Sequence, residues 1–120
     1  MATLKILGAG PVKRGVTKLA AQFEKSSGHR VEVEFAGAPG VRDRVLAGEA
    51  VDVAVVPQSA MEEFEKQGRV VAGTSALMGR SRMGIVVRKG AALPDISSTE
   101  AFKRAMLDAG AIVCNIASSG

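Results

Sequence analysis

Two turns that contain glycine and proline hold the residues best suited to contacting a ligand. They are Ala9, Gly10, Pro11 and Val12 in the first turn, and Gly37, Ala38, Pro39 and Gly40 in the second. Each turn lies between a predicted strand and a predicted helix. Such turns direct backbone N–H groups to the carboxyl edge of a parallel sheet, where they can face an anion. The two turns are therefore the predicted binding site.

The chemistry available in these turns comes mainly from the backbone. Gly10 and Ala38 occupy the predicted N-cap positions, and neither has a side-chain oxygen that could accept from a first-turn amide. Those amides then need water or a ligand as acceptor, and the positive end of each helix dipole favours an anion. The alternative is that water satisfies the amides and the glycines only permit tight turns.

Two later helices are predicted to carry side-chain caps of their own. Ser59 is followed three residues later by Glu62, and Ser97 by Glu100, which are capping-box spacings. This contrast singles out the first two helix starts as places where a ligand could bind.

Charged and hydroxyl side chains near the turns could add to an anion site. We expect the first turns of the two helices to gain positive potential from Lys13, Arg14, Arg42 and Arg44. Ser118 and Ser119 follow a predicted strand, and their hydroxyls could donate to an oxyanion. Those serines could equally cap a helix or end the chain.

The elements that must position these groups alternate between strand and helix. Apolar runs predict strands at 4–7, 31–35, 51–56, 69–71, 83–87 and 111–116. Helical spacing of apolar residues predicts helices ending near Gly28, Ala47, Gly68 and Gly110. This order predicts an α/β fold with a mainly parallel sheet and flanking helices.

Composition excludes several classes of function. The net charge is +4, but the 120 residues contain no Trp, no Tyr and no basic run, which disfavours nucleic-acid binding. His29 is the only histidine and Cys114 the only cysteine, so neither a metal site nor a catalytic triad is predicted. Cys114 falls in a predicted strand and is expected to be a small buried apolar residue. No cofactor is expected in this reading.

An enzyme-class alternative comes from the glycines of the first turn. Gly8-Ala-Gly10 after a strand begins like the dinucleotide fingerprint, and Glu34 could hold a ribose hydroxyl. The third glycine of that fingerprint falls on Lys13, and Gly15 comes two residues too late. The alternative is a Rossmann-like domain of an enzyme that binds an NAD-type nucleotide.

An ordered series of segments resembles a known family. Ala20-Ala-Gln-Phe-Glu-Lys-Ser-Ser-Gly-His-Arg-Val31, Glu34-Phe-Ala-Gly37 and Val45-Leu-Ala-Gly-Glu-Ala-Val-Asp-Val53 resemble the amino-terminal half of periplasmic molybdate-binding-like proteins, the type II solute-binding components of ABC importers. Arg80-Ser-Arg-Met-Gly-Ile-Val-Val-Arg-Lys-Gly90 is similar to the crossing into their second lobe.

The resemblance implies a truncated, two-lobed fold and a role in transport without catalysis. Residues 1–80 would form an incomplete first α/β lobe, and 81–120 the hinge crossing and the start of a second lobe. The ligand would lie between the lobes, against the two turns and Ser119. The partners implied are a small anionic solute and the membrane permease of an ABC transporter. The location implied is the periplasm after removal of a signal peptide, or the cytoplasm if Met1 is the natural start.

The sequence departs from molybdate binders in the two turns. Those proteins use serine hydroxyls there, whereas this chain has Gly10-Pro11 and Gly37-Ala38-Pro39. The prediction is therefore a molybdate-like oxyanion or another small anionic solute. A third, structural hypothesis is a homodimer, in which a second copy replaces the absent half of the fold.

Overall fold

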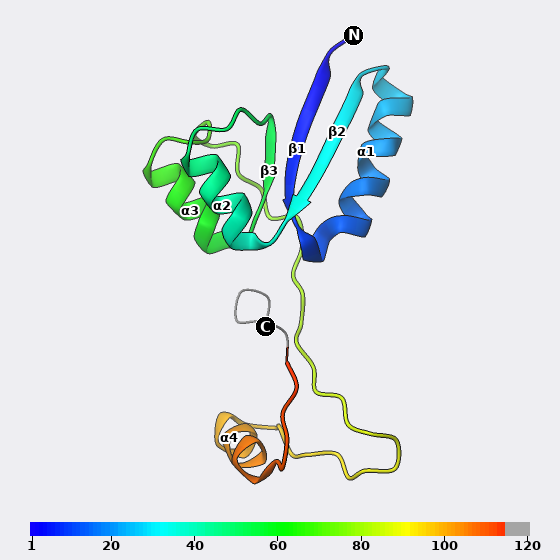
Figure 1. The fold of residues 1–120 in the computed structure, drawn as a ribbon, viewed down its shortest axis with the longest axis vertical. Helices are drawn as coiled ribbons and strands as arrows, with labels where there is room; N and C mark the ends of the chain where they lie inside the picture. The colour runs from blue at the N-terminus through cyan, green and yellow to red at the C-terminus, as the bar shows by residue number, and fades with distance from the viewer. Residues whose placement is uncertain (115–120) are drawn as a thin grey trace. The chain divides into compact units, whose positions relative to one another are not determined.

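A parallel sheet of three strands organises the amino-terminal part of the molecule. The computed structural model describes residues 1–114, which divide after Leu77 into two compact units. In the first unit, β1 (Thr3–Ala9) lies between β2 (Arg30–Ala36) and β3 (Val53–Val55), as Figure 1 shows. The predicted α/β class with a parallel sheet is confirmed.

Helices cover both faces of this sheet. The short 3-10 helix η1 (Gly10–Val12) leads into α1 (Lys13–Ser27), which lies along one face. On the other face lie α2 (Ala38–Leu46) and α3 (Gln58–Lys66), packed side by side (Figure 1). Gly28 ends α1 with φ of 71°, a left-handed conformation that glycine adopts without steric cost.

The register of the strands brings their carboxyl ends to one edge. Ala9 pairs with Ala36, and Gly8 pairs with Val55. Because the three strands are parallel, the chain leaves each of them at this edge and enters a helix there. The fold therefore places both predicted turns side by side.

The main core lies between the sheet and the α2/α3 layer. Leu7, Val41 and Phe64 are completely buried, and Val45 and Ala60 complete the cluster. Strand alternation explains this placement, since Leu7 projects to the face opposite to that of Ile6 and Gly8. On the other side of the sheet, α1 contributes the buried residues Val16 and Ala20.

Two details of the helix starts differ from expectation. Ala38 was expected to be the N-cap of the second helix, but α2 begins at Ala38 itself, because Pro39 fits the first turn of a helix. Ser59 was expected to cap the third helix, but Pro57 is the N-cap of α3 and Ser59 lies inside the helix. The predicted capping box at Ser59 is therefore wrong.

The second unit contains one helix among its described residues, α4 (Thr99–Asp108). Its N-cap is Ser98, whose hydroxyl accepts from the amide of Ala101 at 3.1 Å. Ser97, the predicted cap, instead donates to Asp95 at 2.6 Å. Either Ser97 or Ser98 could supply the cap, and the capping-box spacing predicted Ser97, which is wrong.

Three predicted strands do not form among the described residues. Residues 69–71, 83–87 and 111–114 are mainly apolar, but none of them pairs in a ladder. The rest of the last predicted strand, 115–116, lies outside the described residues. An apolar run becomes a strand only where a neighbouring strand takes up its hydrogen bonds, and a sequence pattern does not show that neighbour. No helix within residues 1–114 combines the length and apolarity that a membrane span requires.

Candidate functional site

The first predicted turn leads from the end of β1 into η1 and α1. Ala9 is buried and serves as the N-cap of η1, and Val12 serves as the N-cap of α1. Gly10 is thus the first residue of η1 rather than the predicted cap, and its carbonyl accepts from the amide of Lys13. Neither start has a side-chain acceptor for its amides.

The second predicted turn forms the first turn of α2. Gly37 is the N-cap, and its carbonyl accepts from the amide of Val41 at 3.0 Å. Ala38, Pro39 and Gly40 are already helical, so Ala38 is not the cap. As predicted, no side chain caps this helix.

The expected contrast with the third helix is wrong. The N-cap of α3 is Pro57, which has no side-chain oxygen, so α3 also begins without a side-chain cap. Three helix starts at one sheet edge therefore lack side-chain acceptors, rather than two.

A packed contact joins β1 and β2 just before the two turns. A Cβ atom on Gly8 would lie 3.1 Å from Cε1 of Phe35, which is closer than ordinary van der Waals contact. Lys13, the first residue of α1, places its ammonium 5.9 Å from the centre of the same ring. Gly8 is thus needed for close packing of an aromatic ring, and the ring in turn holds a cation beside the edge.

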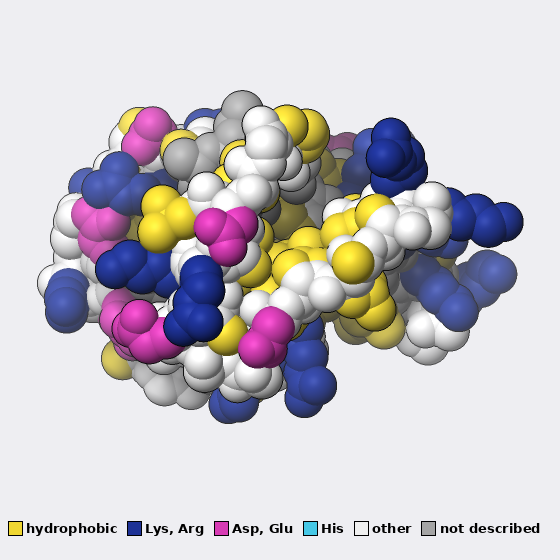
Figure 2. All heavy atoms as spheres, turned by 90° about the horizontal axis from the view of Figure 1, so that it is seen from below, with side chains coloured by type: hydrophobic (Ala, Val, Ile, Leu, Met, Phe, Trp, Pro, Cys, Tyr) yellow, Lys and Arg dark blue, Asp and Glu magenta, His cyan; other side chains and the backbone are white. Residues whose placement is uncertain are grey.

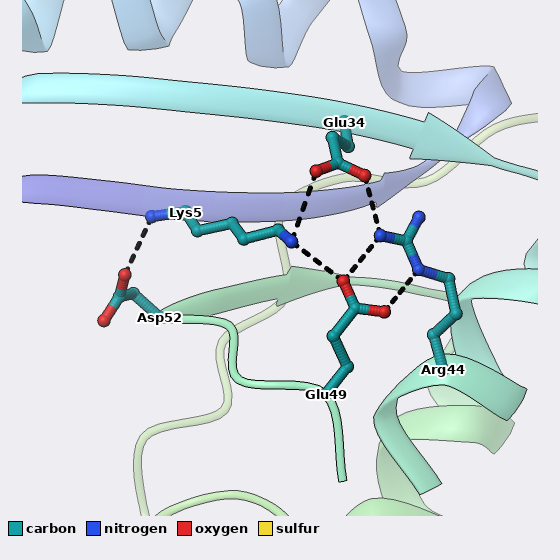
Figure 3. Close-up of polar contacts among 5 residues, drawn as sticks. All are labelled: Lys5, Glu34, Arg44, Glu49 and Asp52. Carbon is teal, nitrogen blue, oxygen red and sulfur yellow. Dashed lines mark hydrogen bonds and ion pairs between the residues drawn. The ribbon is translucent and has the colours of Figure 1, made fainter. Parts of the chain in front are cut away.

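A network of ion pairs lies on the α2/α3 face of the sheet (Figure 3). Lys5 Nζ lies 3.2 Å from Glu34 and donates to Glu49 at 2.8 Å. Arg44 donates to Glu49 through Nε at 2.5 Å and to Glu34 through Nη2 at 2.7 Å. Asp52 accepts from the backbone amide of Lys5 at 2.7 Å and extends the contact between β1 and the start of β3.

The network keeps its members charged. Hydrogen bonds from Arg44 and then Lys5 lower the pKa of Glu49 to about 2, and the same two cations lower the pKa of Glu34. In return, hydrogen bonds to Glu49 and Glu34 raise the pKa of Lys5 and of Arg44. The side chains are half-exposed, so solvent screens these pairs and their role is to fix geometry.

A second clamp joins α2 to α3. Arg42 donates to both carboxylate oxygens of Glu63, at 2.6 and 2.8 Å, and these bonds lower the pKa of that carboxyl. Arg42 and Arg44 were expected to add positive potential at the turns, but both are paired with carboxylates. Within residues 1–114, Lys13 and Arg14 have no carboxylate within 4.0 Å.

Ser118, Ser119 and Cys114 are the remaining residues singled out by the sequence. Ser118 and Ser119 lie outside the described residues, so the structure does not place them. Cys114, expected to be buried in a strand, is exposed and outside any strand. The described residues contain no group of three or more His, Cys, Asp or Glu side chains that could hold a metal ion.

The ion-pair network is not apparent from the sequence. The alternation of Glu32 and Glu34 with apolar residues is typical of a strand with one hydrated face, but it does not show which cations lie opposite. The partners of Glu34 come from β1 and α2, so their contacts depend on the sheet order. The same network commits Glu34, the residue proposed for the ribose in the dinucleotide alternative, to Arg44 and Lys5.

Comparisons with known proteins give a family match and a curated relative that is named as an enzyme. The family model of a bacterial extracellular solute-binding protein matches residues 4–120. An aconitate isomerase from Pseudomonas is 30% identical over 125 residues, which cover 98% of this chain and 47% of that protein. The chain thus spans about half the length of the curated relative it matches.

Solved structures also match the fold, and one of them is a substrate-binding domain. It is described as the substrate-binding domain of a molybdenum ABC transporter from Clostridium difficile, with a TM-score of 0.52 and 16% identity. The match covers 56% of this chain and 30% of that one. At this identity the similarity concerns the fold alone.

Proposed function

Because the chain belongs to the family of bacterial extracellular solute-binding proteins, we propose that it binds a small organic anion with carboxylate groups. The ligand site is the carboxyl edge of the sheet, where η1/α1 and α2 begin. The observation that carries the proposal is the adjacency of two helix starts without side-chain caps. Beside them lie Lys13 and Arg14, which form no ion pair among residues 1–114.

Each part of this edge has a chemical role. Backbone amides of the first turns donate to carboxylate oxygens, and the helix dipoles favour their charge. Lys13 and Arg14 add positive charge from α1, while Phe35 limits the positions open to the Lys13 ammonium. Ser118 and Ser119 are proposed to add hydroxyl donors.

A carboxylate is favoured over molybdate for two reasons. The two turns hold Gly10-Pro11 and Gly37-Ala38-Pro39, so they supply no hydroxyl donors for a tetrahedral oxyanion. The similar protein from Pseudomonas is named for action on aconitate, which is a small carboxylate anion. A molybdate-like oxyanion remains the second candidate, supported by the fold shared with the molybdenum transporter domain.

We propose binding for transport rather than catalysis. An isomerase that moves a proton needs a general base placed beside its substrate. In the described structure, Glu34, Glu49 and Glu63 are hydrogen-bonded to cations that keep them ionised and weakly basic. The proposed partner is the permease of an ABC importer, and the proposed location is outside the cytoplasmic membrane.

A thermal-shift and calorimetric titration tests the proposal. The panel contains cis-aconitate, citrate, molybdate and sulfate, each added to the 120-residue chain. A ligand at a hundred times its Kd should stabilise the protein by about 2.7 kcal/mol. We expect cis-aconitate or citrate to raise Tm and the inorganic oxyanions to leave it unchanged.

Two variants locate the site. Lys13→Met should weaken carboxylate binding roughly ten- to a hundredfold, because a charge-assisted contact contributes about 1.5–3 kcal/mol. Lys18→Met is the matched control, since Lys18 lies on the same helix but beyond its first turn. Equal affinity of both variants, or selective binding of molybdate, would contradict the carboxylate site.

A further inference from the structure

Phe35 and Gly8 form a contact that fixes an aromatic ring near the carboxyl edge of the sheet. The two residues are partners in the register of β1 and β2, one residue before each strand ends. A Cβ on Gly8 would lie 3.1 Å from Cε1 and 3.2 Å from Cδ1 of the ring. The ring therefore lies against the backbone of β1, and the absence of a side chain at residue 8 gives it room to do so.

The same ring is in contact with a cation. The Lys13 ammonium lies 5.9 Å from the ring centroid, and a cation within about 6 Å of an aromatic face is attracted by the ring quadrupole. Lys13 is exposed, whereas Phe35 is half-buried. An ammonium has three N–H donors, and the ring contact leaves them available to a carboxylate. The ring can thus hold Lys13 in place without using up its donors.

Arg14 is the cation with which Lys13 can be compared. Lys and Arg side chains are frequent on the protein surface, as the face in Figure 2 shows. Arg14 is exposed and follows Lys13 in α1, but no aromatic ring of residues 1–114 is in cation–π contact with it. A long side chain that is already held loses less conformational entropy on binding than a free one. The contribution of Lys13 to an anion site should therefore depend on the ring, and that of Arg14 should not.

We propose that Phe35 is a positioning residue of the carboxylate site, whose ring holds the Lys13 ammonium where it can pair with the ligand. This inference rests on the proposed function and adds to it that the affinity supplied by one cation requires an aromatic side chain on β2. Gly8 belongs to the same arrangement, because it allows the ring to lie against β1.

NMR of the 120-residue chain without ligand tests the contact itself. Ring currents shift the resonances of nuclei near an aromatic face, so the side-chain resonances of Lys13 should be displaced from those of Lys18 in the unsubstituted chain. Phe35→Leu should remove this displacement, and Phe35→Tyr should keep it because tyrosine has the same ring. Lys13 resonances that match those of Lys18 in the unsubstituted chain, or that are identical in all three proteins, would overturn the proposal.

A double-mutant cycle on the affinity for cis-aconitate tests the role in binding. Phe35→Leu should raise Kd about two- to fivefold, as expected for the loss of an exposed cation–π contact. In the Lys13→Met background the same substitution should leave Kd unchanged, because no ammonium remains to be held. In the Arg14→Met background, the matched control, it should again raise Kd about two- to fivefold. Phe35→Tyr should retain the affinity of the unsubstituted chain.

The outcomes separate this inference from the proposed function. If the unsubstituted chain binds cis-aconitate and Phe35→Leu raises Kd equally in the Lys13→Met and Arg14→Met backgrounds, the positioning role is wrong and the binding site stands. Equal losses of affinity in Phe35→Leu and Phe35→Tyr would also contradict the positioning role, since tyrosine supplies the same ring face. If the unsubstituted chain binds no carboxylate, the proposed function is wrong and the positioning role is wrong with it.

Discussion

At the scale of single residues, Gly8 is the position where side-chain size matters most in the candidate site. A Cβ there would meet the Phe35 ring at 3.1 Å, and that ring also lies below the Lys13 ammonium. Gly8→Ala should therefore destabilise the first unit by about 1–3 kcal/mol through overpacking. Urea unfolding followed by circular dichroism measures the change.

Gly15 provides the control for that substitution. A Cβ on Gly15 meets nothing within 4 Å, and the residue lies in α1. Gly15→Ala should stabilise the protein by up to about 1 kcal/mol, because alanine favours the helix. Destabilisation of equal size by both substitutions would contradict the packing argument.

Glu49 gives the first unit a measurable response to acid. Its folded-state pKa is about 2, below the ordinary value of 4.5, because Arg44 and then Lys5 donate to it. Its contribution to folding is therefore fully present above pH 4.5 and is lost as pH falls toward 2. Glu49→Gln should lower the free energy of unfolding at pH 7 and flatten its dependence on pH in that window.

Glu62→Gln is the matched comparison for the acid response. Glu62 accepts only from Gln58 and belongs to no ion pair in the described part of the chain. Chemical denaturation at a series of pH values distinguishes the two variants. An unchanged acid profile for Glu49→Gln would show that the network does not couple to folding.

At the scale of elements, the order from β1 to α3 follows from the sequence because its apolar periodicities are strong and local. Val16 and Ala20 recur at helical spacing, and Leu7 lies in an apolar run. The caps were less predictable, since Ser97 and Ser98 offer the same oxygen one residue apart. The strand predicted at 83–87 does not form for a different reason: ladder partners are set by the tertiary fold.

The core between β1, α2 and α3 should be the most sensitive part of the first unit. Phe64 and Leu7 are fully buried in one cluster. Phe64→Ala should cost about 3–5 kcal/mol through lost burial and a cavity, whereas Leu19→Ala, at a half-exposed position, should cost much less. Similar losses in equilibrium unfolding would contradict the assigned core.

Hydrogen exchange can test whether the helix caps are those of the structure or those predicted from the sequence. Ser98→Ala removes the acceptor of the Ala101 amide, and should cost about 1 kcal/mol at the start of α4, or about fivefold in exchange rate. Ser59→Ala should leave α3 unchanged, because Ser59 caps nothing there. A larger effect at Ser59 would restore the capping box predicted from sequence.

At the scale of the whole molecule, the sequence resemblance to solute-binding proteins is confirmed by the family match over residues 4–120. The boundary between two lobes that this resemblance implies, near residue 80, stays a prediction. The backbone part of the candidate site followed from glycine and proline in the turns. The pairing of Arg42 and Arg44 with carboxylates could not be predicted from the sequence, because Glu63 and Glu49 contact them only in the folded structure.

The measurement that tests the central claim most directly is an amide NMR titration of the 120-residue chain with cis-aconitate, with molybdate in parallel. A site at the carboxyl edge predicts saturable shifts at the amides of 10–14 and 37–40, excluding the prolines, for cis-aconitate. The same shifts should need more ligand in Lys13→Met. No shift at high ligand concentration, or shifts confined to other parts of the chain, would contradict the anion site.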